Sequence, residues 1–209
     1  MIFGRLATSF LVALLLTVLT SLSFAQEKVP TPTPTPPKPV EYVLPYPGIL
    51  PDHPLYFLKM ARDRILFWFI TDPLRKAEFN LLQADKRLNS GLALLSKENY
   101  ALAESTLSKG GKYLEQVVVE IEKAQKVGKD TDALTSKLSL AALKHQEVLS
   151  ETLEKLPESN RTGVQDALER AQKVTEWVKE TQKKKLEKRL QEKILGRNFS
   201  SVRVEAKEK

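Results

Sequence analysis

Apolar residues spaced three and four positions apart run through most of the second half of the chain and predict amphipathic helices. Two such stretches, 74–95 and 100–124, are separated by a short polar turn at 97–99. Within each, large apolar residues alternate along the seam with small ones, as Leu81 and Ala84 do. Small residues on facing seams let two backbones approach closely, and a short turn makes the helices antiparallel. The pattern therefore predicts a tight helical hairpin.

Two further helices are predicted after the hairpin. Gly128 is suited to end its second helix, and Asp130 or Thr131 can start the next, whose wide apolar face suits a bundle interior. Pro157 ends that helix, and the last one is longer than its neighbours, so its far end should extend beyond the bundle. No useful stretch alternates with period two. The predicted fold class is all-α, an antiparallel helical bundle built around the hairpin.

Capping residues predict two helix starts, one for the hairpin and one for an earlier helix. Asp72 followed by Pro73 combines a capping carboxylate with a proline that fits the first helical turn, and it starts the hairpin. Asp52 is expected to cap an earlier helix that tolerates Pro54 in its first turn and runs to about Ile70.

Six consecutive large apolar residues, 65–70, close this earlier helix. They cover every face of a helix, so a single partner surface cannot bury them all. One interpretation is burial between the hairpin and a proline-rich segment on the other side. The other is an exposed edge at Phe67 and Trp68 that contacts a membrane interface or a partner.

Two proline-rich segments precede the helices. Residues 29–39 alternate proline mainly with threonine, which predicts a stiff polyproline II spacer, either plain or glycosylated on its threonines. Residues 42–54 instead alternate prolines with large apolar side chains. A solvated spacer has no use for such side chains, so this second segment is expected to lie as a strap against the helices. The side chains concerned are Tyr42, Leu44, Tyr46, Ile49 and Leu50.

The amino terminus has the features of a secretory signal peptide. Arg5 precedes a long apolar stretch, and Ser23 and Ala25 place small residues before a cleavage site at Gln26. The alternative is an uncleaved membrane anchor, because a stretch of about 20 residues is just long enough to span a bilayer.

Four segments are therefore expected: a signal peptide (1–25), a Pro/Thr-rich linker (26–41), a helical domain (42–195) and a disordered basic tail (196–209). The chain has no cysteine. An exported domain without disulfides must be held by a packed core, and this chain is long enough to form one.

The net charge of +7 belongs to the carboxyl-terminal part of the chain. Residues 170–209 contain 13 basic and 6 acidic residues, whereas residues 26–169 contain 19 and 20. The cluster expected to contact an anionic surface is Lys183, Lys184, Lys185, Lys188, Arg189 and Lys193. Lysines dominate it and aromatic residues are scarce nearby, which favours anionic lipid or wall polymer over nucleic acid. The alternative is a solvated helical extension without a partner.

No constellation for catalysis, metal binding or cofactor binding is recognisable. His53 and His145 are the only histidines, and no cluster of histidines and carboxylates has the spacing of a metal site. His145 lies on an apolar helical face and is expected in the core or at its boundary. Nucleophile elbows, phosphate-binding loops and dinucleotide fingerprints are missing from the sequence. We therefore expect no enzymatic activity, no metal and no cofactor.

The segments LPYPGILPDHPLYFLK (44–59) and ITDPLRKAEFNLLQADKRL (70–88) resemble those of a bacterial family of exported helical proteins known only as a domain of unknown function. The resemblance covers about Glu41 to Thr181. It implies a helical bundle and export, and it carries no assigned activity.

Together these features predict an exported, non-catalytic helical module that binds an unknown protein or envelope polymer in the cell envelope or outside the cell. The alternative is a membrane-surface protein that uses Phe67, Trp68 and the basic helix. A chaperone-like or metal-stress protein is a weaker third option, because histidine is scarce and cysteine is absent.

The mature protein is predicted to begin at Gln26, because Ser23 and Ala25 supply the small residues that cleavage requires. The intact mass of the secreted protein measures this directly. Recovery of a membrane-embedded chain that retains residues 11–16 would show that the segment is an anchor.

Overall fold

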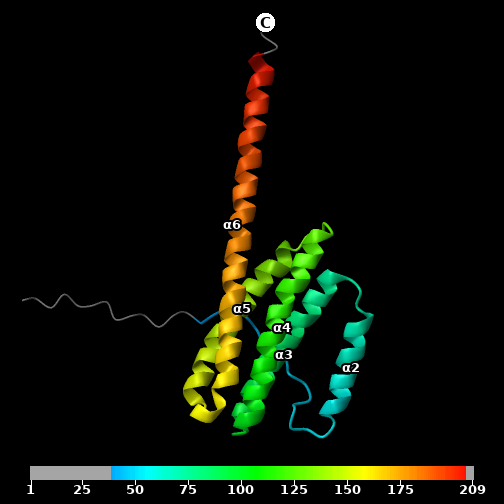
Figure 1. Cartoon of the computed structure of the whole chain (residues 1–209), viewed down its shortest axis with the longest axis vertical. Coiled ribbons are helices and arrows are strands. Elements are labelled where there is room, and N and C mark those ends of the chain that lie inside the picture. Colours follow the sequence, from blue (N-terminus) through cyan, green and yellow to red (C-terminus); the bar gives the residue numbers. More distant parts are fainter. Residues whose placement is uncertain (1–38, 206–209) are drawn as a thin grey trace, which may run out of the picture. The chain divides into compact units, whose positions relative to one another are not determined.

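The computed structural model describes residues 39–205, with side chains to residue 194, so the predicted signal peptide and most of the linker lie outside the described part. Within this part there are five α-helices, one 3-10 turn and no strand, which confirms the all-α prediction. The elements, shown in Figure 1, are α2 (Tyr56–Phe69), α3 (Pro73–Leu95), α4 (Tyr100–Lys126), α5 (Asp132–Lys155), η1 (Glu158–Asn160) and α6 (Thr162–Glu205).

The helices α3 to α6 form the bundle. The hairpin predicted from the sequence is α3 and α4, which lie side by side in Figure 1 and have the most extensive contact of any pair. The first half of α6 packs against both α4 and α5, and α5 closes the arrangement against α3. The core consists of two apolar clusters, one around Leu81, Leu114 and Leu138 and the other around Leu88, Leu107 and Leu149.

The start of α3 follows its sequence signal. Asp72 is the N-cap, Pro73 occupies the first helical position, and the Asp72 carboxylate accepts a hydrogen bond from the backbone N–H of Leu74 at 2.8 Å. A side-chain acceptor here satisfies a backbone donor that has no partner within the helix. The ion pair with Lys129 is the main cause that lowers the pKa of Asp72, with the backbone donors adding to it.

The end of α4 is also as predicted. Gly128 has a φ of +75°, a left-handed conformation that costs glycine little. Its N–H bonds the carbonyl of Gln125, and the N–H of Lys129 bonds the carbonyl of Ala124 at 3.0 Å. This pair of bonds is the Schellman motif, and it satisfies carbonyls at the helix end before α5 begins.

Asp52 does not cap α2, and this prediction was wrong. The helix begins at Tyr56, and residues 51–55 form turns. A cap at Asp52 would place Pro54 at the position whose N–H the carboxylate normally accepts, and proline has no N–H. The carboxylate instead accepts a hydrogen bond from Lys97 at 2.7 Å, in the turn between α3 and α4.

The strap comprises residues 42–54, and its first half lies against the bundle as predicted. Tyr42 and Leu44 pack on the two apolar clusters. The side-chain amide of Asn89 donates to the carbonyl of Pro45 at 3.0 Å, and the backbone N–H of Val40, just before the strap, donates to Glu147 at 2.8 Å.

The second half of the strap turns away from the bundle towards α2. Gly48 has a φ of +72°, and the ammonium group of Lys59 donates to the carbonyls of Pro47 and Ile49 at 2.7 and 3.1 Å. Tyr46 is 82% exposed and Ile49 is also exposed, so the prediction that they lie against the helices was wrong. The strap therefore packs on the bundle core only through Tyr42 and Leu44, and from Pro47 onward it contacts α2 instead.

The helix α6 is longer than predicted. It runs unbroken to Glu205, so residues 196–205 are helical where a disordered tail was expected. Its buried positions end at Val178, and all of residues 182–194 except Lys185 are exposed. We call residues 182–205 the α6 extension; it is the orange-to-red end of the helix in Figure 1.

Adjacent glycines on α4 face two different helices. A Cβ atom on Gly110 would lie 3.4 Å from the Cβ of Arg87 on α3, an ordinary contact distance. A Cβ atom on Gly111 would lie 2.8 Å from the Cα of Ala167 on α6, where there is no room for it. The sequence predicted the close contact with α3, whereas the closer contact with α6 had not been foreseen.

We predict that Gly111→Ala is less stable than Gly110→Ala by about 1–3 kcal/mol, the usual cost of overpacking a core. Both substitutions gain the same helix propensity, about 1 kcal/mol, so their difference isolates the packing against Ala167. Chemical denaturation of the two variants and the wild type measures it. Equal stability of the two variants would mean that α6 can move away from α4 at little cost.

Candidate functional site

The helix α2 rests on the outer side of α3 through one stripe of side chains. Arg87 of α3 donates hydrogen bonds to the Tyr56 hydroxyl at 2.9 Å and to the Met60 sulfur at 3.3 Å. The rings of Phe67 and Phe79 lie 5.8 Å apart. Backbone contacts between α2 and the bundle helices are few, so these side chains define how α2 is held.

The opposite side of α2 is apolar and exposed. At about 100° per residue, six side chains occupy an arc of roughly 120° on this side. We call them the outer face of α2: Phe57, Leu58, Ala61, Ile65, Trp68 and Phe69. Trp68 is 81% exposed and Phe69 is 71% exposed. Contiguous exposed aromatic and aliphatic side chains of this kind are unusual on a soluble monomer and mark contact surfaces.

The structure separates the two residues proposed as a contact edge. Phe67 points inward, half-buried on Phe79, with the Lys76 ammonium 5.3 Å from its ring centre. Trp68 points outward with the outer face. Burial of the whole run 65–70, one of the two interpretations of the sequence, is therefore wrong. One side of α2 meets α3, and no described segment covers the other.

Basic residues flank the outer face. By the same helical geometry, Arg62 lies beside Leu58 and Ile65 at one edge, and Arg64 lies beside Ala61 and Trp68 at the other. Asp63 is the only acidic residue of α2, and it points inward and is buried. Arg64 is therefore the basic border on one side, Arg62 on the other side is ion-paired with Asp63 at 2.7 Å, and the outer face itself presents no carboxylate.

Lysine adds to this charge on the strap side of α2. Burial lowers the pKa of Lys59, and the neighbouring charges of Lys86, Arg87 and Arg62 lower it further against the opposing effect of Asp63. Lys59 is thus a partly buried cation with Lys86, Arg87 and Arg62 among its neighbours, and its ammonium group is bonded to the strap carbonyls of Pro47 and Ile49.

A pocket of about 430 Å³ lies beneath one edge of α2, with Ala61 and Arg64 on its lining. Its apolar walls are Met60, Phe67, Phe79 and Tyr113, and Asp63 also lines it. Asp63 is 7% exposed, and its Oδ2 atom has no hydrogen-bond partner in the described part of the chain. Buried carboxylate oxygens are normally paired, so the lining contains an unsatisfied carboxylate together with the basic side chain of Arg64.

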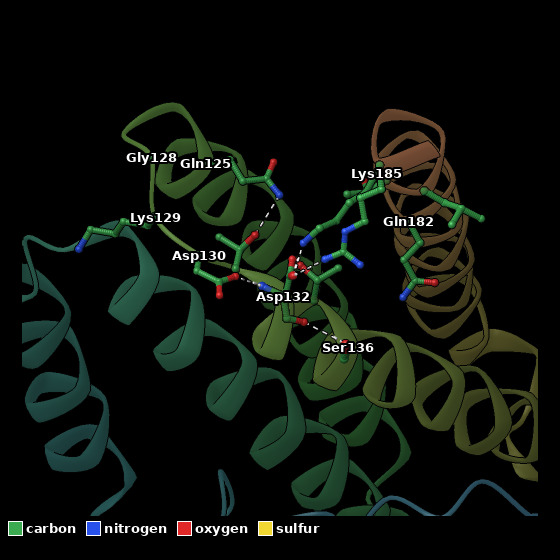
Figure 2. Close-up of a pocket in the computed structure, with 13 residues that line it drawn as sticks. Gln125, Gly128, Lys129, Asp130, Asp132, Ser136, Gln182 and Lys185 are labelled. Atoms are coloured by element: carbon green, nitrogen blue, oxygen red, sulfur yellow. Dashed lines mark hydrogen bonds and ion pairs between the residues drawn. The ribbon is translucent and has the colours of Figure 1, made fainter. Parts of the chain in front are cut away.

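A second pocket, of about 620 Å³, lies where α6 leaves the bundle, beside the turn between α4 and α5. Figure 2 shows Lys185 reaching from α6 towards Asp132 at the start of α5, and Arg189 approaches the same carboxylate at 3.7 Å. Other polar groups of the pocket also bond one another, as Gln125 does with Thr131 at 3.0 Å. We interpret this pocket as the attachment of the α6 extension to the bundle.

Half of the predicted anionic-surface cluster is paired within the chain. Lys185 and Arg189 contact Asp132, and Lys184 pairs with Glu180 at 2.7 Å, which raises the pKa of Lys184. The remaining members of the cluster are exposed and have no ion pair with any residue between 39 and 194. They are Lys183, Lys188 and Lys193.

A buried polar trio joins the strap to α3 and α5. Asp85 accepts a hydrogen bond from the Tyr42 hydroxyl at 2.6 Å, and its other oxygen lies 3.0 Å from Nε2 of His145. His145 is 1% exposed, which confirms its predicted place in the core. Burial raises the pKa of Tyr42, and the hydrogen bond to Asp85 raises it further. The spacing of these residues along the sequence carries no signal that would have brought them together.

Neither a metal cluster nor a membrane span is found in the part of the chain that the structure describes. Its histidines and carboxylates form no group of three or more that could hold an ion. None of its helices combines the length and the apolar composition needed to cross a bilayer.

Comparison with known proteins gives one match. The family model described as "Domain of unknown function (DUF5667)" matches residues 48–159, more than half of the chain. The chain therefore belongs to this family, as the segments around α2 and the start of α3 had suggested. The searches of curated proteins and of solved structures returned no match.

We predict that Tyr42→Phe lowers the free energy of unfolding by about 1 kcal/mol near neutral pH, because Asp85 loses a donor. An unfolded tyrosine loses its proton near its ordinary pKa of 10.0, below the raised value in the folded protein. The wild type must therefore lose stability as the pH rises above 10, and the difference between wild type and variant must shrink.

Unfolding midpoints of both proteins between pH 7 and 11 test this, with Tyr46→Phe as the control at an exposed position of the same strap. A difference that stays constant across this range would show that Tyr42 is not tied to Asp85 in solution.

Proposed function

We propose that this member of the DUF5667 family is an exported, non-catalytic helical module that attaches to an anionic membrane surface through the outer face of α2. The observation that carries the proposal is the exposure of Trp68 and Phe69 on a continuous apolar arc bordered by Arg62 and Arg64.

This combination of side chains suits a helix that lies in the plane of a membrane interface. Tryptophan is enriched at the level of the headgroups, because its ring is apolar and its N–H is polar. Interfacial helices bury their apolar face to a depth of about 5–10 Å and place basic residues beside the lipid phosphates. In this protein the polar side of the helix is replaced by the bundle itself, since the opposite stripe of α2 packs on α3.

The charge pattern favours lipid over a protein partner. Arg64 borders the outer face on one side, Arg62 borders it on the other and is 61% exposed although it pairs with Asp63, and each basic residue near an anionic surface contributes about 1 kcal/mol of binding free energy. The exposed lysines of the α6 extension add long-range attraction of the same sign. Together these charges support a contact that weakens as salt is added.

We predict that replacing Trp68 and Phe69 by alanine weakens binding to anionic vesicles at least tenfold, or about 1.4 kcal/mol. The assay is co-sedimentation of the chain from Gln26 onward, at low and at physiological salt, so that the apolar amino-terminal stretch does not contribute. Both side chains are already exposed, so the fold should be unchanged in circular dichroism.

The matched control is Leu140→Ala combined with Leu143→Ala, which removes two exposed apolar side chains from α5 instead. We expect this control to bind like the wild type. The proposal would be contradicted if the α2 variant and the wild type were retained equally, or if the α5 control lost as much binding as the α2 variant.

A further inference from the structure

We propose that the pocket beneath α2 binds the headgroup of an anionic phospholipid that ends in a hydroxyl group, as phosphatidylglycerol does. This inference rests on the membrane contact proposed above and names the lipid that it recognises.

The first step of the argument is the unpaired oxygen of Asp63. Arg62 donates both of its bonds to Oδ1, at 2.7 and 3.1 Å, and leaves Oδ2 without a partner in the described part of the chain. Asp63 is more than nine-tenths buried and lines the pocket. A buried carboxylate oxygen without a donor is costly, so a ligand hydroxyl gains binding free energy if the Asp63 side chain turns this enclosed oxygen towards it.

The second step is the charge around the pocket. Arg64 is the basic residue on its lining, whereas Lys59 and Lys86 line a separate pocket on the strap side of α2. An arginine guanidinium is well suited to bind a phosphate oxygen. The positive charge of Arg64 disfavours an ammonium group as the donor to Asp63. A neutral hydroxyl on an anionic headgroup satisfies both requirements.

The third step is the shape and position of the pocket. Its volume of about 430 Å³ falls within the range of small-molecule sites, roughly 300–1,000 Å³. The rings of Phe67, Phe79 and Tyr113 offer apolar walls to the C–H groups of a glycerol unit. Two residues of the lining adjoin the outer face: Ala61 lies one turn from Phe57, and Arg64 lies one turn from Trp68. A lipid in the contacted leaflet can therefore present its headgroup to the pocket.

The test compares two anionic lipids that differ in the hydroxyls alone. The full chain is mixed with phosphatidylcholine vesicles that contain equal fractions of either phosphatidylglycerol or phosphatidylpropanol, with the same acyl chains. The two vesicles carry the same charge. The apolar amino-terminal stretch contributes equally to both, so the ratio of the two affinities reports the headgroup.

We expect the wild type to bind phosphatidylglycerol vesicles at least fivefold more tightly, and Asp63→Ala to reduce this ratio to one. Leu140→Ala combined with Leu143→Ala, the control on α5 described above, should leave the binding to both vesicles and the ratio unchanged. Because the wild-type ratio needs no variant, the test holds even if Asp63→Ala disturbs α2.

A wild-type ratio of one would overturn the inference, and so would a ratio that Asp63→Ala leaves unchanged. If the wild-type ratio is one while Trp68→Ala with Phe69→Ala still weakens binding to both vesicles, the headgroup site is wrong and the membrane contact stands. Failure of the wild type to bind either vesicle would overturn both proposals.

Discussion

The close approach of α6 to α4 depends on Gly111, which meets the backbone of Ala167 with no room for a side chain. Its neighbour Gly110 faces α3 across an ordinary contact distance, so one turn of a single helix contacts two others. The distance to α3 matters beyond the bundle, because α3 also carries Asp85, which holds the strap, and Arg87, which holds α2. A shift between α3 and α4 would therefore reach the surface elements that have almost no core of their own.

The bundle was predictable because its signals are local. Helix spacing, the Asp72–Pro73 start and the Gly128 end each depend on a few neighbouring residues, and all three appear in the structure. The predicted start of α2 was wrong for two reasons. Asp52 binds a distant partner, Lys97, and Pro54 has no backbone N–H to donate to the Asp52 carboxylate. The trio of Tyr42, Asp85 and His145 could not be predicted from the sequence, because contacts between distant segments leave no periodic pattern in it.

The candidate site was predicted only in part, and the reason lies in how α3 is covered. The polar residues Asp85 and Arg87 are buried because the strap and α2 close over a side of α3 that its apolar stripe does not mark. Once Arg87 and Phe79 hold the inner stripe of α2, Phe67 must face inward and Trp68 outward. The unusual run 65–70 signalled a contact surface, but which residue would face solvent depended on these distant partners.

The attachment of α2 by a few side chains also gives this region a stability of its own. Bundle helices interlock through close-packed backbones, whereas α2 is held mainly by the bonds of Arg87 and one aromatic pair. Segments with few buried apolar contacts open at a lower free energy than the global unfolding transition. The amides of α2 therefore belong to a separate cooperative unit, a small foldon that can detach while the bundle remains native. Seating α2 in a lipid interface would add the contacts that it lacks, so a bilayer would complete the folding of this helix.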